Sequence, residues 1–540
     1  MSRLVPPLNF SLQSSPMRKY FPDLPTFTTS AQTADIVPVY RQLLADRLTP
    51  VTAFELLGRD AHAFLLESVI GNEKVGRYSF IATSPSKVYQ VAEGNAAILT
   101  PRHADEFKTT DPLADLQKMM PPRRYHKDPN LPAFTGGLVG FAGYDTIRYY
   151  EPEKLDHPPK DDRRLPDLLF GLYEELVIFD HVDKTIKVVA NAMIPEEVGS
   201  GQLAVGSKAA ASGSSTANRQ LPTANSIDAA YRNACHRIDG IVARLQQPPL
   251  SALGEIDPRA PMNLQFTSNF TREGFEEAVR KGLEYIKAGD IFQFVPSQRL
   301  RVPSPADPFD VYRALRIINP SPFMFFLKSP SCTLIGASPE ILCRVMDGKV
   351  TTRPLAGTRR RGHTDAEDQL LEKELLADPK ERAEHIMIVD LHRNDVGRVA
   401  RVGSVEVTDM MTVERYSHVM HITTNVTGIL DEGYTALDAL RVSLPVGTVS
   451  GAPKIRAMQI IDELEPTRRG PYGGAVGYLD FAGNLDTCIA LRTMVWRNGV
   501  YDVQAGAGVV ADSIPASEYE ETMNKAKAML KAVEIAQGGF

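Results

Sequence analysis

Short apolar runs that end at polar turns recur along the chain and predict antiparallel β-hairpins. The clearest turns are Gly94-Asn95, Asp347-Gly348, Gly483-Asn484 and Asn498-Gly499, each between two apolar runs. Pairs of Gly with Asn or Asp favour hairpin turns because these residues tolerate the positive φ that such turns require. The run "ELVIFDHVDKTIKVVA" (175–190) predicts a further hairpin.

Apolar residues at helical spacing predict helices between these hairpins. Residues 270–290 show this spacing up to Gly289, where the helix is expected to end. Asp378 followed by Pro379 predicts the start of a second helix, and Ser517 is the predicted start of the last one. Hairpins interspersed with helices favour an α+β protein over a doubly wound parallel sheet.

Two stretches of low complexity divide the chain. Residues 1–34 are rich in Pro, Ser and Thr, and we expect them to form a flexible leader. Residues 195–226 are rich in Gly, Ser and Ala, as flexible linkers are. These stretches leave an N-terminal part at residues 35–194 and a C-terminal part at residues 227–540.

The composition excludes several classes of protein. A formal net charge of -6 weighs against a general binder of nucleic acid or anionic membranes, because such proteins carry a basic excess. The four cysteines form no C-x-x-C pair, which favours neither a zinc site nor a disulfide framework and is typical of a reducing compartment. No apolar run approaches the roughly 20 residues that a membrane span needs. We therefore expect a soluble cytoplasmic protein.

Two glutamates on predicted helices are candidates for a metal site. Glu521 and Lys525 share a helix face, which indicates either a surface ion pair or a metal or carboxylate site. Glu384 precedes an apolar run, so its carboxylate either stays in water or faces inward against a cation. Two such glutamates at one pocket would suit Mg²⁺, a hard ion that binds one or two carboxylates and retains waters.

Three further motifs leave alternatives open. His421, in an apolar stretch, is either a core residue or an acid–base group, and with His418 it completes no zinc pattern. The string "LPVGTVSGAPK" (444–454) departs from the G-x-x-x-x-G-K-[ST] phosphate loop and so disfavours ATP binding. The basic string "RPLAGTRRRG" (353–362) is compatible with a binding site for nucleic acid or phosphate, with a pocket for a small acid, or with a solvated loop.

Strings that cover nearly all of residues 266–530 resemble the chorismate-utilising enzymes and, within them, the anthranilate synthase component I branch. In the N-terminal part the resemblance covers fewer residues, mainly "FLLES" (64–68) and "GGLVGFAGYD" (136–145). The matching C-terminal strings include "GDIFQFVPSQR" (289–299), "NPSPFMFFL" (319–327), "GASPE" (336–340), "RPLAGTRRRG", "LLADPKERAEHIMIVDLHRNDVGRV" (375–399), "YSHVMHITTNVTG" (416–428), "LPVGTVSGAPKIRAMQIIDELEP" (444–466) and "RRGPYGGAVGYLDFAGNLDTCIALRT" (468–493).

This resemblance implies two antiparallel sheets packed as a sandwich and flanked by helices, with the two parts of the chain intimately packed. It implies chorismate as substrate and Mg²⁺ held by Glu384 and Glu521. Glu340 is implied to protonate the hydroxyl that leaves C4 when ammonia adds at C2, and His421 to assist the later loss of the C2 proton and pyruvate. The implied substrate-binding residues are Ala356, Gly357, Thr358, Thr448, Tyr472, Arg492, Gly506, Ala507, Gly508 and Lys525.

Two positions distinguish branches of this family. Gln293 stands where isochorismate and salicylate synthases carry a water-activating lysine. Ala356 stands where aminodeoxychorismate synthases typically carry a lysine that attacks C2. Both positions point to anthranilate, the product of the first step of tryptophan biosynthesis. Release of aminodeoxyisochorismate without loss of pyruvate stays as the alternative.

The resemblance also implies partners and regulation. The sequence contains no recognisable glutamine-amidotransferase segment, so a separate glutamine amidotransferase subunit (component II) is implied as the source of ammonia. Tryptophan is implied as a feedback inhibitor that binds between the two parts, although Phe323 departs from the tyrosine common in that pocket. The residues that match this allosteric site are Glu67, Ser68, Asn319, Pro320, Met324 and Cys488.

Overall fold

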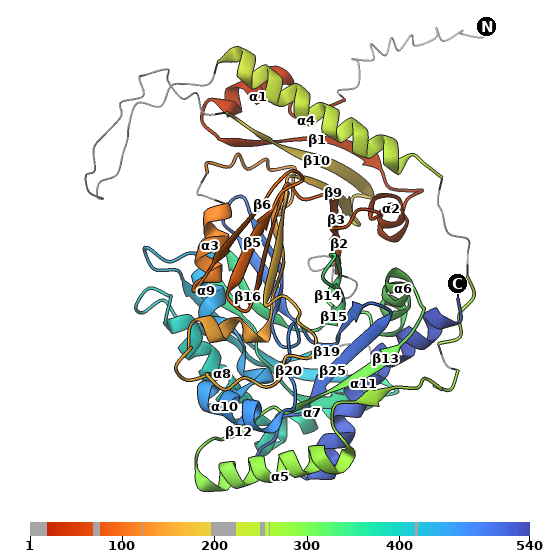
Figure 1. Cartoon of the computed structure of the whole chain (residues 1–540). Helices are drawn as coiled ribbons and strands as arrows, with labels where there is room; N and C mark the ends of the chain where they lie inside the picture. Colours follow the sequence, from red (N-terminus) through yellow and green to blue (C-terminus); the bar gives the residue numbers. More distant parts are fainter. Residues whose placement is uncertain are drawn as a thin grey trace, which may run out of the picture.

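Two large antiparallel β-sheets form the centre of the molecule, with helices on their outer faces (Figure 1). The computed structural model describes residues 19–68, 76–120, 123–195, 223–248, 254–258, 260–415 and 419–539. The predicted α+β fold, a sandwich of antiparallel sheets flanked by helices, is confirmed.

The first sheet has eleven strands and is shared by both parts of the chain. β2 of the N-terminal part pairs with β14 of the C-terminal part, where Glu67 lies opposite Met324. In spatial order the strands are β1 (Ile36–Leu44), β10 (Thr185–Met193), β9 (Glu175–Asp180), β3 (Tyr78–Thr83), β2 (Ala63–Glu67), β14 (Phe323–Lys328), β15 (Thr333–Ser338), β24 (Thr493–Arg497), β25 (Val500–Gly506), β13 (Ser297–Pro303) and β11 (Thr267–Ser268).

The second sheet is shared in the same way, because β22 pairs with β7 along its whole length. In spatial order its strands are β18 (Leu355–Arg360), β20 (Val419–Ile429), β17 (Lys349–Thr352), β16 (Ile341–Met346), β23 (Leu485–Ile489), β22 (Ala475–Asp480), β7 (Gly137–Ala142), β8 (Leu168–Tyr173), β4 (Lys87–Ala92), β5 (Asn95–Leu99) and β6 (Ala104–Lys108), with β19 (Glu406–Arg415) also paired to β20. A small separate sheet pairs β12 (Gln293–Phe294) with β21 (Gly451–Ala452).

Helices cover the outer faces and both ends of the sandwich. Figure 1 shows α1 and α4 over β1 and β10 at one end and α5 at the opposite end. Within the described ranges, no helix is both long and apolar enough to cross a membrane. The helices are α1 (Leu24–Ala31), α2 (Pro50–Leu57), α3 (Pro112–Met119), α4 (Ala224–Leu245), α5 (Arg272–Ala288), α6 (Pro308–Ile318), α7 (Asp365–Ala377), α8 (Pro379–Gly397), α9 (Ala436–Ser443), α10 (Lys454–Leu464) and α11 (Pro515–Gln537), with short 3₁₀ turns η1 (Tyr144–Tyr149) and η2 (Gly447–Val449).

The apolar core between the sheets is built from both parts of the chain. Phe141 on β7 and Val476 on β22 face the same cluster as Phe325 on β14 and Val495 on β24. Each of these side chains is at most 5% exposed, and burial of a large apolar side chain contributes about 1.5–3 kcal/mol. The N- and C-terminal parts are therefore held together by a common core as well as by shared sheets.

The predicted hairpin turns are all present. Gly94, Gly348, Gly483 and Gly499 have φ between 74° and 86°, the left-handed region that glycine adopts without strain. The predicted hairpin at 175–190 is formed by β9 and β10.

The predicted leader was too long. Residues 24–31 lie inside it but form α1, where the ring of Phe27 is fully buried and lies 5.0 Å from the ring of Tyr231 on α4. Contact with α4 stabilises a helix whose own sequence is weakly helical. Most of the predicted linker at 195–226 falls outside the described residues, and Ala224 begins α4.

The start of the last helix was also predicted two residues too late. α11 begins at Pro515 rather than at Ser517, and Ile514 is its N-cap residue without a side-chain hydrogen bond. Proline suits the first helical position because its φ is already helical and the amide it lacks has no partner there. The predicted end of α5 and the predicted start of α8 are confirmed, since α5 ends at Gly289 with φ 85° and Asp378 caps α8.

Candidate active site

One large pocket gathers the side chains that the sequence analysis singled out. It has a volume of about 1130 Å³ and is lined by residues of α8, α11, β18 and β20, among others. All predicted catalytic, substrate-binding and metal residues except Ala507 line it. They are Glu340, Ala356, Gly357, Thr358, Glu384, His421, Thr448, Tyr472, Arg492, Gly506, Gly508, Glu521 and Lys525.

Ala507 departs from the prediction. Its side chain is fully buried, and its amide donates to the carbonyl of Pro296 at 3.1 Å, so it lies behind the pocket wall. Its neighbours Gly506 and Gly508 line the pocket. A Cβ atom at Gly506 would lie 2.9 Å from the hydroxyl of Tyr472, so glycine at this position leaves room for the tyrosine.

Glu340 is a buried carboxyl at the bend between β15 and β16. Its side chain is 4% exposed, and this burial raises its pKa to about 8, although Arg492 and Lys525 act in the opposite direction. Burial has this effect because the charged form loses its hydration. Glu340 is therefore protonated at neutral pH and can donate a proton inside the pocket.

His421 is held as a neutral base. Its Nδ1 atom lies 2.9 Å from the carbonyl oxygen of Gly357 on β18. Because a carbonyl only accepts hydrogen bonds, Nδ1 carries the ring proton and Nε2 is left as the basic nitrogen. Burial lowers the pKa of His421 to about 4, and Arg492 and Lys525 lower it as well. The pocket thus contains one protonated acid and one neutral base at neutral pH.

A bulge in β18 sets the position of that carbonyl. The register with β20 shifts between Ala356 and Thr358, and Gly357 between them has φ 65°. Glycine suits this left-handed conformation, which turns the chain out of the regular ladder. Ala356 is only 8% exposed and carries no amine that could attack a ligand.

Two helices bring carboxylates to one side of the pocket. Glu384 on α8 accepts a hydrogen bond from Nε2 of Gln293 at 2.9 Å. Burial raises the pKa of Glu384, and the carboxylates of Glu381 and Glu521 raise it further. Glu521 on α11 also forms an ion pair with Lys525 at 2.6 Å, the first of the two alternatives left open for this pair, while the metal site stays a prediction.

Glu518 is a candidate that the sequence analysis missed. It lies one turn before Glu521 on α11, it is 8% exposed, and its Oε2 atom has no hydrogen-bond partner among the described residues. Burial raises its pKa, as does Glu521. The available signal was the three-residue spacing of Glu518 and Glu521, which Glu381 and Glu384 repeat on α8.

These carboxylates fit a hard cation. The pKa values of Glu384 and Glu518 are raised, and such carboxylates are stabilised by a neighbouring positive ion. Mg²⁺ binds through one or two carboxylates while it retains waters. Across the described ranges, no cluster of three or more His, Cys, Asp or Glu side chains forms a ready-made metal centre. A cation at this site would therefore depend on few protein ligands.

The pocket also offers hydrogen-bond donors and positive charge. Arg492 lies close enough to Glu340, His421 and Tyr472 to lower the pKa of each. Burial raises the pKa of Tyr472 to about 12, so its phenol keeps its proton. The hydroxyl of Thr448 is buried and lies close enough to the carboxyl of Glu340 to lower its pKa. This arrangement suits a ligand carboxylate.

The arginines of 353–362 are engaged in ion pairs. Arg359 pairs with Asp378 and Glu381 at the start of α8, at 2.8 and 3.0 Å. Arg361 pairs with Asp368 on α7 at 2.8 Å. They neutralise acidic side chains of α7 and α8 rather than present a basic surface.

Five of the six residues predicted for a tryptophan site lie where β2, α6 and β14 meet, and the sixth, Cys488, lies on β23 of the other sheet. The carboxylate of Glu67 is buried and accepts hydrogen bonds from the hydroxyl of Tyr312 at 2.6 Å and from Nε of Arg316 at 2.7 Å. Met324 on β14 is paired with Glu67 on the adjacent strand β2. Cys488 is buried in the core between the sheets.

Two polar groups at this junction are unsatisfied. The hydroxyl of Ser68 and the Nδ2 group of Asn319 are buried, and neither has a hydrogen-bond partner within the described residues. Asn319 ends α6, and Pro320 follows it in the connection to β14. Buried polar groups are nearly always paired, so both atoms are expected to have partners other than the described residues, and Asn319 also lines the large pocket. His418, the remaining histidine of the sequence analysis, lies outside the described residues.

Comparison with known proteins identifies the family. The family described as chorismate binding enzyme matches residues 62–531. The chain is 44% identical to anthranilate synthase component 1 of Acetivibrio thermocellus, over 96% of this chain and 99% of that protein. It is 45% identical to the protein of the same name from Thermus thermophilus, over 94% and 99% of the two chains.

A solved structure agrees with this assignment. Anthranilate synthase component I from Streptococcus pneumoniae superimposes with a TM-score of 0.70 at 36% identity, over 90% of this chain and 99% of that one. The chain therefore belongs to the chorismate-binding enzymes and, within them, to the anthranilate synthase component 1 family.

Proposed function

We propose that this chain converts chorismate and ammonia into anthranilate and pyruvate, as component I of an anthranilate synthase. The observation that carries the proposal is the coexistence of a protonated acid, Glu340, and a neutral base, His421, in one pocket. The names of the relatives and the absence of a lysine at Ala356 support the same reaction.

In the first step, ammonia adds to ring C2, the two ring double bonds shift, and the hydroxyl leaves from C4. Hydroxide is a poor leaving group, so a proton donor at its oxygen lowers the barrier. Glu340 gives its proton to this oxygen, and water departs. The raised pKa of Glu340 keeps that proton available at neutral pH.

In the second step, the amino intermediate loses the C2 proton and the bond from C3 to the enolpyruvyl oxygen breaks. The ring becomes aromatic anthranilate, and the released enolpyruvate takes up a proton to become pyruvate. Nε2 of His421 accepts the C2 proton, because the carbonyl of Gly357 holds the ring proton on Nδ1. Arg492 and Tyr472 bind the carboxylate of the enolpyruvyl group.

Glu384 and Glu521 hold Mg²⁺ in this proposal, with Glu518 beside them. The support is that burial raises the pKa of Glu384 and of Glu518, and that Glu521 lies close enough to raise both pKa values further. When bound, Mg²⁺ neutralises and orients the ring carboxylate of the substrate. Lys525 supplies a further positive charge at the same side.

A product assay tests the proposed function. Purified protein with chorismate, Mg²⁺ and ammonium should form fluorescent anthranilate and pyruvate in equal amounts. Formation of aminodeoxyisochorismate without pyruvate would instead favour a synthase without the lyase step. If neither product appears at any ammonium concentration, the chain does not have this activity.

We expect His421→Ala to separate the two steps. Without the base, loss of the C2 proton should slow by about a hundredfold or more, while addition of ammonia continues. Chromatography of the reaction mixture should then show the amino intermediate accumulating at the expense of anthranilate. Equal slowing of chorismate consumption and anthranilate release would place His421 in the first step instead.

The source of ammonia is a separate subunit in this proposal. A glutamine amidotransferase would generate ammonia from glutamine and deliver it to the pocket in the cytoplasm. The chain alone should therefore use ammonium but not glutamine. Glutamine-dependent turnover by the purified single chain would contradict the need for a partner.

Feedback inhibition by tryptophan is proposed at the junction of β2, α6 and β14. The hydroxyl of Ser68 and the amide of Asn319 are buried and have no hydrogen-bond partner among the described residues, which supports a polar ligand there. We expect Ser68→Ala to weaken tryptophan inhibition about fivefold, because one hydrogen bond to the ligand is lost. The measurement is the tryptophan concentration that halves the rate. Unchanged inhibition in this variant would remove Ser68 from the site.

A further inference from the structure

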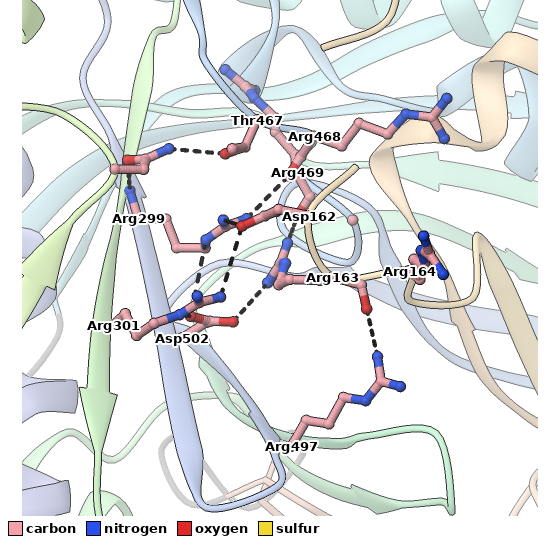
Figure 2. A network of polar contacts seen from close by, with 12 residues as sticks. Asp162, Arg163, Arg164, Arg299, Arg301, Thr467, Arg468, Arg469, Arg497 and Asp502 are labelled. Carbon is pink, nitrogen blue, oxygen red and sulfur yellow. Dashed lines mark hydrogen bonds and ion pairs between the residues drawn. The ribbon is translucent and has the colours of Figure 1, made fainter. Parts of the chain in front are cut away.

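A loop that carries Tyr472 into the pocket is fastened to the N-terminal part of the chain. We call residues 465–474, between α10 and β22, the Tyr472 loop. Figure 2 shows the polar network in which its residues meet Asp162 and Arg163 of the N-terminal part. This network lies outside the pocket and holds none of the residues assigned a chemical role above.

The backbone of the Tyr472 loop is held at successive residues. The amide of Arg468 donates to the carbonyl of Lys160 at 3.0 Å, and the amide of Tyr144 donates to the carbonyl of Gly470 at 2.9 Å. Between these points, Nη2 of Arg163 donates to the carbonyl of Arg469 at 2.7 Å (Figure 2). Segments of the N-terminal part therefore fix the loop just before Tyr472.

The position of Arg163 is restricted by contacts of both its side chain and its backbone. Its side chain is 8% exposed and lies 3.6 Å from the carboxylate of Asp502, which is 9% exposed. Its own carbonyl accepts a hydrogen bond from Nη1 of Arg497 at 2.5 Å. Gly470 has φ 60°, and a Cβ atom there would lie 3.0 Å from Nη2 of Arg163. Glycine thus lets the guanidinium approach the loop.

The side chain of Arg469 connects the Tyr472 loop to the backbone of two segments that border the pocket. This guanidinium is buried, donates to the carbonyls of Val449 and Val295 at 2.6 Å each, and lies 5.7 Å from the ring of Tyr472. Val449 follows Thr448, which lines the pocket. A displacement of the loop at residue 469 would therefore shift Tyr472 and Thr448 together.

We propose that Arg163 is a positioning residue for the substrate pocket: by binding the carbonyl of Arg469 it holds the Tyr472 loop, so that the N-terminal part completes the wall that receives the substrate carboxylate. This inference rests on the proposed function for the identity of the substrate. It assigns the N-terminal part a role in catalysis that is separate from any role in regulation.

The test compares Arg163→Met with Arg163→Lys and with the neighbouring Arg164→Met. Arg164 is exposed and Figure 2 draws no contact from it to the network, so it controls for loss of positive charge. Arg163→Met should raise KM for chorismate about tenfold, the usual effect of losing one hydrogen bond to a charged group, with a smaller change in kcat. Arg163→Lys keeps a donor and should recover part of the loss, and Arg164→Met should match the wild type.

Hydrogen exchange provides a readout that does not depend on activity. Amides of residues 468–474 should exchange at least several-fold faster in Arg163→Met, while those of β7 stay unchanged. Wild-type KM and exchange in Arg163→Met, or faster exchange spread over the whole chain, would overturn the proposal. If the wild type forms no anthranilate, the proposed function fails, yet exchange at the Tyr472 loop still decides the positioning role.

Discussion

Glu340→Gln is expected to lower kcat for anthranilate formation by about a thousandfold, because the amide cannot protonate the hydroxyl that leaves C4. The substitution keeps the shape of the side chain and removes only the acidic proton. Binding of chorismate, measured by calorimetry without ammonia, should change little. Glu520→Gln is the matched control, since Glu520 lines the rim of the same pocket but is exposed and paired with Arg272.

The same substitution should stabilise the protein at high pH. The pKa of Glu340 is about 8 in the folded chain and about 4.5 in the unfolded chain. A carboxyl whose pKa is raised by folding contributes most to stability below pH 4.5, and that contribution declines as the pH rises toward 8. Glutamine has no such dependence.

The free energy of unfolding of Glu340→Gln should therefore exceed that of the wild type at pH 9 by about 2–4 kcal/mol. Denaturant titrations at pH 5 and pH 9 measure the difference. A full loss of activity together with identical stability at both pH values would show that Glu340 is not held in its protonated form.

Glu384→Gln is expected to lower the affinity for Mg²⁺ by about a hundredfold and to abolish turnover at low Mg²⁺ concentration. The physical reason is the loss of a half-buried carboxylate that lies beside the like charges of Glu381 and Glu521. Titration calorimetry with Mg²⁺ gives the affinity, and the anthranilate assay over a range of Mg²⁺ concentrations gives the activity.

Stability separates a metal ligand from a structural residue in this test. Glu384→Gln removes one of several neighbouring negative charges, so the melting temperature in the presence of a chelator should not fall. Asp390→Asn is the control on the same helix, because Asp390 is 65% exposed and pairs only with Arg393 among the partners described for it. Wild-type Mg²⁺ affinity in Glu384→Gln would remove this residue from the metal site.

Local features of the fold follow from the sequence because they depend on a few adjacent residues. The turns at Gly348 and Gly499 require a positive φ that few residues other than Gly, Asn and Asp adopt. Asp378 followed by Pro379 sets the start of α8 in the same local way. The candidate residues of the pocket came from longer strings of sequence, where the resemblance to chorismate-utilising enzymes is strong.

Apart from the start of α11, the errors lie where distant contacts outweigh local preference. The segment around Phe27 was taken as a leader, but it forms a helix because it packs on α4, some two hundred residues later in the chain. Glu518 was missed, since an exposed and a buried glutamate look alike in the sequence.

The sequence by itself determined the hairpins, the end of α5, the start of α8 and most of the predicted residues that line the pocket. Only the tertiary structure decided their chemical state. Glu340 becomes an acid with a pKa of about 8 because the fold buries it, and His421 becomes a base at Nε2 because Gly357, 64 residues away, accepts its Nδ1 proton. The hydrogen bond from Arg163 to Arg469 spans 306 residues. The pKa and the protonation site of a side chain depend on burial, charges and hydrogen bonds from residues that are close in space. A local sequence pattern does not show which residues these are.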